Sequence, residues 1–490
     1  MSTTTVVTQP SIQLEANIGR ALGTSDTVSN RTYAPVYSRF SNVQKGSMTA
    51  FIAFGGLLAS MSTTSVLAAV PEIAETFHTT PTAINISNAV YLVFVGLSCC
   101  FWGPWADVFG RKSAYVGSTT LFLVFSIGTA LSRNLVAFFV FRALTACQVT
   151  ALLIVGPSCI SDIYHPVQRG TSLGWFACGC MLGPAFGPLL SGIIVTYTSW
   201  RVIFWLQAGL AGFGLLQAIF VLHETLQQLR YKELRGKGFR HGLVNLWEWS
   251  NPWTVFKLLG QKNLLCVNLA SASTAWNMYS LLTPIRFVLN PRLNLTTPLQ
   301  SGLLYLVPGA GYLIGTQVGG RLVDHVVKSW IRRRGFRLQE DRLRSSILTL
   351  GILLPGSTLL YGWSVDRNFG GVALPGICMF VQGFAQTCAF PSLNAYILDV
   401  MQHKSGKASG AYSPRDFPFR IFFSFSIASY FLMRYSFSAV ATASCLPLIE
   451  TVGVGWTVTI SSAMVWIGSG LVLLTISSGE HWRTARAAQN

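Results

Sequence analysis

Charged residues are scarce in this chain, and acidic ones are the scarcest. Only 11% of its 490 residues are charged, whereas about a quarter are charged in a soluble globular protein. There are 17 Asp and Glu against 35 Lys and Arg. The mean hydropathy is +0.47, and 51% of the residues are hydrophobic. This composition excludes an ordinary soluble domain and indicates a chain that lies mostly within a lipid bilayer.

The sequence also lacks the patterns of an enzyme or of an ATP-driven pump. It contains no Gly-x-x-x-x-Gly-Lys-Ser/Thr loop that would cradle a nucleotide phosphate. Its seven histidines are scattered without metal-ligand spacing, and nearly all of its ten cysteines fall inside apolar stretches. We therefore expect no enzymatic activity, no cofactor and no bound metal.

Apolar stretches of about 20 residues recur along the chain, which is the length that a helix needs to cross the hydrocarbon core. They lack the short alternating pattern of an outer-membrane barrel, so we expect helices. The predicted spans are Thr49–Pro71, Ile84–Pro104, Ser113–Leu131, Leu135–Pro157, Ser172–Thr196, Val202–Leu222, Leu264–Phe287, Ser301–Val323, Ser346–Trp363, Val372–Leu398, Phe417–Leu448 and Trp456–Ile476. The predicted fold is an all-α membrane protein with twelve transmembrane helices in two six-helix bundles.

The same pattern divides the chain into five parts. Residues 1–47 are polar and lack apolar periodicity, so we expect a disordered cytoplasmic tail. The two bundles are expected at 48–222 and 264–477, joined by a cytoplasmic linker at 223–263. Residues 478–490 form a second, short cytoplasmic tail.

The positions of Lys and Arg predict the orientation, because short cytoplasmic loops hold the excess of positive charge. The side richer in Lys and Arg contains Arg111, Lys112, Arg169, the linker residues Arg230, Lys232, Arg235, Lys237 and Arg240, and then Lys328, Arg332, Arg333, Arg334, Arg337, Arg342, Arg344, Lys404 and Lys407. Both termini are therefore expected in the cytoplasm. The net charge of +18 reflects this topology and attraction to anionic lipid, and no nucleic-acid partner is expected. Asn294, in Asn-Leu-Thr on the opposite side, is the predicted glycosylation site.

The loop between the second and third predicted spans carries the most informative motif. It runs Gly103-Pro-Trp-Ala-Asp107-Val-Phe-Gly110-Arg111-Lys112. This stretch resembles the loop signature of the major facilitator superfamily, whose Asp, Gly and Arg it matches position for position. The resemblance implies a gating role, in which the acid and the base bridge helices on the inner face and stabilise the outward-open state.

A degenerate copy of this signature follows the eighth predicted span. It runs Gly319-Gly320-Arg321-Leu-Val-Asp324-His-Val-Val-Lys328. Such internal repetition is typical of a transporter built from two bundles, with the substrate held near the midplane between them. The resemblance therefore covers the chain from the first span to the last.

The fifth predicted span contains small residues at helical spacing and two prolines. Small residues allow close helix contact and prolines supply kinks. Gly183, Pro184, Gly187 and Gly192 resemble the antiporter motif of drug:proton exporters within the superfamily. The alternative is glycine that serves helix packing alone. The resemblance favours an exporter over an importer.

Arg142 is predicted inside the fourth span, and a charge within the bilayer indicates a functional residue by default. It matches the buried Arg that the superfamily links to proton transfer. Thr145 and Ala146 stand where the family usually has Gln and Gly, so the match is incomplete. The alternative is an Arg that snorkels to the interface, since it lies in the outer part of the span.

Four further stretches resemble a narrower group, the fungal twelve-span drug:proton antiporter subfamily, in the branch with citrate and itaconate exporters. They are Tyr279–Arg286, Pro298–Gly302, Glu340–Arg344 and Phe390–Asn394. This resemblance implies a fungal plasma membrane, a small-molecule substrate and protons as the coupling ion. We expect a monomer in the lipid bilayer.

The predicted spans contain Arg142 and Arg434 but no deep Asp or Glu. Cationic side chains without anionic ones favour a carboxylate-bearing substrate over an organic cation. Other polar residues expected along the path are Gln148, Asn277, Gln386 and Asn394. For each of these the alternative is a helix–helix hydrogen bond.

The predicted function is secondary active export of a small organic acid or acidic metabolite by alternating access. A multidrug or toxin:proton antiporter is the first alternative, and a transporter-like nutrient receptor is an alternative of another class. Uniport and anion exchange stay open because the spans lack a deep carboxylate.

The eleventh predicted span departs from the subfamily pattern. In subfamily members a Gly-Asn-Tyr-like stretch leads almost directly into an Arg-Tyr pair. In this chain an extra segment, at about residues 414–433, lies between Tyr412 and Arg434. A real tilted helix with an interfacial segment is one interpretation, and a translated intron is the other, which we favour. A real insertion would displace the helix that carries Arg434.

Overall fold

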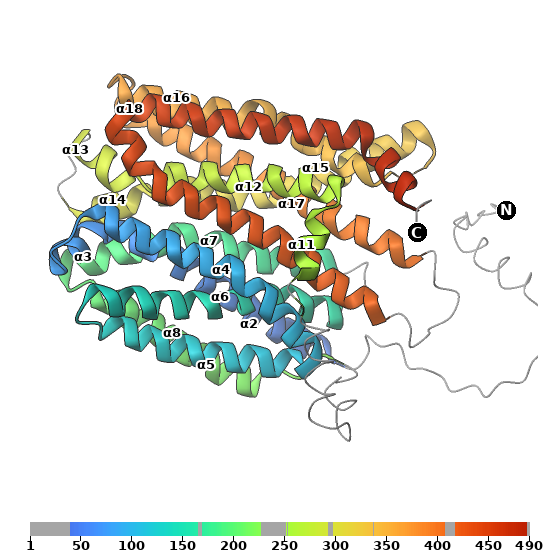
Figure 1. The fold of residues 1–490 in the computed structure, drawn as a ribbon, viewed down its shortest axis with the longest axis horizontal. Helices are drawn as coiled ribbons and strands as arrows, with labels where there is room; N and C mark the ends of the chain where they lie inside the picture. The colour runs from blue at the N-terminus through green and yellow to red at the C-terminus, as the bar shows by residue number, and fades with distance from the viewer. Residues whose placement is uncertain are drawn as a thin grey trace, which may run out of the picture. The chain divides into compact units, whose positions relative to one another are not determined.

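The computed structural model describes residues 40–164, 169–226, 251, 253–292, 297–336, 338–406 and 417–487. All regular elements in these ranges are helices (Figure 1). The predicted glycosylation site Asn294, nearly all of the predicted N-terminal tail and most of the predicted linker lie outside the described residues. The described helices belong to one unit, Asn42–Asn490.

The first set of helices, here called the N bundle, covers the six predicted spans of the first half. Its elements are α2 (Asn42–Thr64), η2 (Ser65–Ala68), α3 (Val70–Thr76), α4 (Pro81–Phe109), α5 (Arg111–Ala130), α6 (Leu135–Ile163), α7 (Arg169–Tyr197) and α8 (Arg201–Phe220). Local sequence explains two of the starts, because the side chains of Thr80 and Asn134 accept hydrogen bonds from the amides of Ala83 and Ala137 at the first turns of α4 and α6.

The second set, here called the C bundle, contains shorter pieces between its long helices. Its elements are α12 (Lys262–Leu282), η3 (Ile285–Leu289), α13 (Asn290–Arg292), α14 (Pro298–Leu304), α15 (Leu306–Arg334), η4 (Gln339–Ser346), η5 (Thr349–Leu353), α16 (Leu354–Asp366), α17 (Ala373–Gly406) and α18 (Phe417–Ala487). A short helix, α11 (Trp253–Leu259), precedes it within the stretch predicted as a linker.

Helix α18 is 71 residues long and contains two spans. Gly453 has a φ of 86°, which favours glycine and breaks the helix into two arms that meet at a bend (Figure 1). The first arm starts at Phe417, so at about 1.5 Å per residue it is about 54 Å long, well beyond the roughly 30 Å hydrocarbon core. The unusual length predicted for the eleventh span is therefore present in the helix.

The segment suspected to be a translated intron packs as part of this first arm. Phe425, Ala428 and Tyr430 lie in a hydrophobic core, and the amide of Asn268 donates to Ser429 Oγ at 3.3 Å. Arg434 is carried by the same helix and reaches the interior. The intron hypothesis is a statement about the gene, so it stays a prediction.

The twelve spans differ in how apolar they are. Nine helices in the described ranges are long and apolar enough to cross a membrane, and α18 is counted once among them. The remaining two long helices, α12 and α15, contain many Asn, Ser and Gly residues or a basic end. The prediction of an all-α membrane protein with twelve transmembrane helices is confirmed.

Candidate functional site

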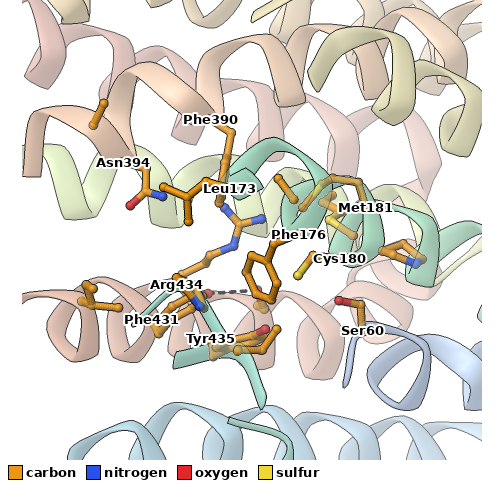
Figure 2. Close-up of a pocket in the computed structure, with 18 of the residues that line it drawn as sticks. Ser60, Leu173, Phe176, Cys180, Met181, Phe390, Asn394, Phe431, Arg434 and Tyr435 are labelled. Atoms are coloured by element: carbon orange, nitrogen blue, oxygen red, sulfur yellow. Dashed lines mark hydrogen bonds between the residues drawn. The ribbon is translucent and has the colours of Figure 1, made fainter. Parts of the chain in front are cut away.

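A cavity of about 560 Å³ lies between the two bundles. Helices α2, α6 and α7 line it from the N bundle, and α12, α15, η4, α17 and α18 line it from the C bundle. Its size falls in the range of about 300–1,000 Å³ that is usual for small-molecule sites. Figure 2 shows Phe176 and Cys180 of α7 facing Arg434 and Tyr435 of α18 across it.

Arg434 is the positive charge inside this cavity. Its side chain extends from α18 toward Phe390 on α17, and it is only 9% exposed (Figure 2). The guanidinium carbon lies 5.0 Å from the centre of the Phe390 ring, and Nη1 donates to Tyr430 Oη at 3.5 Å. No carboxylate pairs with it among the residues that the structure describes. A buried guanidinium in this state is a ready partner for an anionic ligand.

One end of the cavity is charged and reaches the surface. Its lining there includes Asp324, which is exposed, and an ion pair between Arg342 Nε and Asp399 Oδ2 at 3.0 Å. Asp324 belongs to the degenerate copy of the loop signature. In the same copy, a Cβ at Gly319 would lie 2.7 Å from Cys388 Cα, so this glycine allows close packing of α15 on α17.

The opposite end is held shut by contacts between the bundles. Arg286 of η3 pairs with Glu72 of α3, and its Nη1 also donates to Ser301 Oγ at 3.2 Å. The amide of Leu299 donates to Thr196 Oγ1 at 3.0 Å. Burial raises the pKa of the Glu72 carboxyl above its ordinary value, although the charge of Arg286 opposes this shift.

The antiporter-motif residues make two different kinds of contact. Cβ atoms at Gly183 and Gly187 would lie 2.6 Å from Met61 N and 2.7 Å from Thr64 Oγ1, both on α2 of the same bundle. A Cβ at Gly192 would instead lie 2.6 Å from Pro298 O, across the interface with the C bundle. Pro184 lines the cavity itself. The motif thus serves packing within one bundle and contact between the two.

The gating residues predicted from the loop signature come together as expected from their spacing. Arg111 Nη2 lies 2.6 Å from Asp107 Oδ1, and its Nε lies 3.4 Å from Asp162 Oδ2. Gly110 joins α4 to α5 with a φ of 102°, which favours glycine. Glu224 Oε1 accepts from the amide of Arg111 at 3.0 Å. All four of these charged residues belong to the N bundle or to the segment that follows α8. Gly103 is buried in α4.

Arg142 lies away from the cavity, inside the N bundle. It is 2% exposed, so it does not snorkel to the interface. Its Nη2 donates to Asn88 Oδ1 at 2.9 Å, and its guanidinium carbon lies 4.6 Å from the centre of the Tyr91 ring. A role in proton transfer, implied by resemblance, stays a prediction.

The other predicted path residues fall into two groups. Asn394 lines the cavity, near Arg434 (Figure 2). Asn277 donates to Thr358 Oγ1 and Ser461 Oγ, both at 3.2 Å, and Gln386 accepts from Gln382 at 2.9 Å. Gln148 donates to the carbonyl of Leu144 at 3.3 Å, one turn back in its own helix. In this structure these last three residues bond within or between helices and do not line the cavity.

Sequence reasoning missed two features of the site. One is the aromatic wall, which includes Phe176 and Phe431, because aromatic residues in an apolar span carry no signal of which way they face. The other is the ion pair between Glu72 and Arg286. The opposite charges at the ends of the first and seventh predicted spans were a signal that could have indicated it.

Comparison with known proteins finds membrane transporters. A family model described as "Major Facilitator Superfamily" matches residues 52–415. "MFS-type transporter clz19" of Cochliobolus lunatus is 25% identical over 92% of this chain and 88% of its own length. "Citrate exporter 1" of Aspergillus niger is 23% identical over 92% of this chain and 89% of its own. "MFS antiporter QDR3" of Candida albicans is 33% identical over 40% and 28%.

Solved structures share the fold at low identity. The human organic anion transporter MFSD10 (TETRAN) superposes with a TM-score of 0.63 and 15% identity, covering 87% of this chain and 99% of that one. A D-xylose–proton symporter gives a TM-score of 0.61 and 16% identity, covering 87% and 97%. The chain is a secondary transporter and not an enzyme, and it belongs to the major facilitator superfamily.

Proposed function

We propose that this transporter exports a small organic acid or acidic metabolite. The observation that carries the proposal is Arg434, a buried guanidinium that lines the cavity between the bundles and pairs with no carboxylate in the described part of the chain. A carboxylate substrate would supply the missing partner, whereas an organic cation would be repelled. The names of two relatives, a citrate exporter and an antiporter, support export of this kind.

The proposed mechanism is alternating access. The cavity reaches the surface at the end that carries Asp324, Arg342 and Asp399, which the distribution of Lys and Arg assigns to the cytoplasm. The contact of Glu72 with Arg286 closes the other end, so we infer that this conformation is inward-open. We place both termini in the cytoplasm and the protein in the plasma membrane.

Protons are the proposed coupling ion, on the strength of the family resemblance. Candidate proton carriers near the cavity include Glu72 at the closed end and Asp324 and Asp399 at the open end. In the N bundle, Asp107 and Arg111 are proposed to act as a latch on the cytoplasmic side that stabilises the outward-open state.

A second candidate, a drug or toxin:proton antiporter, is favoured by the aromatic lining of the cavity. Expression in a yeast that lacks its own drug exporters separates the two. We expect efflux of labelled carboxylic acids that depends on an imposed proton gradient and is lost in Arg434→Met. Resistance to neutral or cationic toxins, without efflux of any acid, would establish the drug exporter instead. Binding of an acid without any transport would indicate a receptor.

A further inference from the structure

The charged groups that line the cavity leave room for a single negative charge. Two cations and two carboxylates line it, as Arg434, Arg342, Asp324 and Asp399. Arg342 is already engaged by Asp399 at 3.0 Å, and Asp324 adds a negative charge at the same end. One guanidinium, Arg434, is therefore left to meet a ligand.

The ligand's charge is held well inside the cavity. Arg434 lies over Phe390, which precedes Asp399 on α17 by about 13 Å at about 1.5 Å per residue. A carboxylate bound to Arg434 thus lies deep in the cavity, with Asp324, Arg342 and Asp399 nearer the open end. Any further carboxylate on the same molecule would meet no second unpaired cation among the described lining residues. It would lie beside apolar groups, beside neutral polar groups such as Asn394 and Ser438, or near Asp324.

Apolar and aromatic side chains surround this cation. Those from α7 include Leu173, Phe176 and Met181, and those from α17 and α18 include Phe390 and Phe431 (Figure 2). Ile427 of α18 also lines the cavity. The rings of Phe431 and Tyr435 are stacked at 6.0 Å with an interplanar angle of 19°, so they present a continuous aromatic surface along α18. Such a wall suits a flat ring or a hydrocarbon body.

We infer that the cavity binds a monoanionic carboxylate attached to an aromatic or apolar body, in preference to a compact polycarboxylate such as citrate. This inference rests on the proposed function of acid export. Two unpaired carboxylates of citrate would each lose hydration without gaining a cation. A carboxylate that extends toward the open end would also approach the negative charge of Asp324.

The test uses the purified full-length protein and four probes of related shape. These are 1-naphthoate, its neutral amide 1-naphthamide, the cation 1-naphthylmethylammonium, and citrate. Titration calorimetry should give saturable binding of 1-naphthoate and much weaker binding of citrate. Arg434→Met should weaken 1-naphthoate about 10- to 100-fold, while Arg367→Met, which removes an exposed guanidinium outside the cavity, should leave it unchanged.

Phe431→Leu tests the apolar part of the inference separately. Loss of one aromatic contact should weaken 1-naphthoate about 2- to 10-fold without changing the weak binding of citrate. Should Arg434→Met fail to fold, the wild-type protein still gives an answer through Cys180, which lines the cavity. Saturating 1-naphthoate should slow alkylation of this thiol, and citrate at the same concentration should not.

The possible outcomes distinguish failure of the inferred substrate class from failure of the proposed acid export. Tight binding of citrate that depends on Arg434, with none of 1-naphthoate, would overturn the substrate class and leave acid export standing. Preference for the ammonium probe over 1-naphthoate would overturn acid export itself. Equal affinity for 1-naphthoate and 1-naphthamide would show that the negative charge of the ligand does not contribute to binding at Arg434, which also refutes the inference.

Discussion

Gly192 lies where α7 of the N bundle meets α14 of the C bundle. A Cβ at this position would stand 2.6 Å from Pro298 O and 3.2 Å from Gly302 Cα. Both are backbone atoms of a helix, so neither can rotate out of the way. Gly192→Ala should therefore force the two bundles apart at the end closed by Glu72 and Arg286.

The size of the effect follows from the cost of overpacking, which is about 1–3 kcal/mol for one extra methyl group. In alternating access this contact exists only while this end is closed. The whole cost then acts on the balance between the two conformations and shifts their ratio roughly 5- to 150-fold toward opening at the Glu72 end. The same methyl group at Gly183 would press on α2 of its own bundle, and so should lower stability in both conformations alike.

The native thiol of Cys180 reports this balance, because it lines the cavity. Residue-resolved alkylation by an impermeant reagent applied at the cytoplasmic end should be slower in Gly192→Ala than in the wild type. Gly174→Ala, on the same helix, is the matched control, because a Cβ at Gly174 would meet no neighbouring side chain or helix within 4 Å. Gly183→Ala should lower the melting temperature without changing the rate at which Cys180 is alkylated.

The reasoning is refuted if Gly192→Ala changes neither the alkylation rate nor transport. It is equally refuted if Gly183→Ala shifts the balance as much as Gly192→Ala does. Either result would mean that the contact with Pro298 persists in both conformations.

Three further predictions concern other parts of the fold. Burial raises the pKa of the Glu72 carboxyl in the closed conformation, so protonation favours the conformation that buries this group, although a neutral carboxyl no longer forms the ion pair with Arg286. This stabilisation of the closed end is full below the ordinary carboxyl pKa and is lost as pH rises through the raised one. Cytoplasmic labelling of the cavity, corrected for thiol ionisation, should therefore increase on acidification, and Glu72→Gln should abolish the trend. Gly110→Ala should cost about 1–2 kcal/mol of stability, seen as a lower melting temperature, because its φ of 102° strains any residue with a Cβ. A transcript that lacks the codons between Ser413 and Arg434 would confirm the intron, and one that keeps them would refute it.

Sequence reasoning was strongest where a motif is local. Asp107 and Arg111 are one helical turn apart across a glycine, so their pairing follows from the chain alone. Gly183 and Gly187 share a face of one helix, and close contact with a neighbour was expected, although the neighbour was not.

Sequence reasoning was weaker where the answer depends on how a helix is rotated. Arg142 and Arg434 have the same status in sequence, as cations inside predicted spans, yet one is enclosed by Asn88 and Tyr91 and the other lines the cavity. Asn277 could likewise have faced the path or its neighbours. Only the packing of several helices fixes these directions, and no single span contains that information.

The carboxylate of Glu224 helps to fasten the ends of several N-bundle helices together. Its two oxygens accept from the first two amides of α5, those of Arg111 and Lys112, at 3.0 and 3.2 Å. These are donors that a helix cannot satisfy within itself. Since Arg111 also holds Asp107 of α4 and Asp162 of α6, the ends of four segments are fastened at one point. We therefore expect the ends of α4, α5, α6 and the segment after α8 to move together whenever the N bundle changes its orientation.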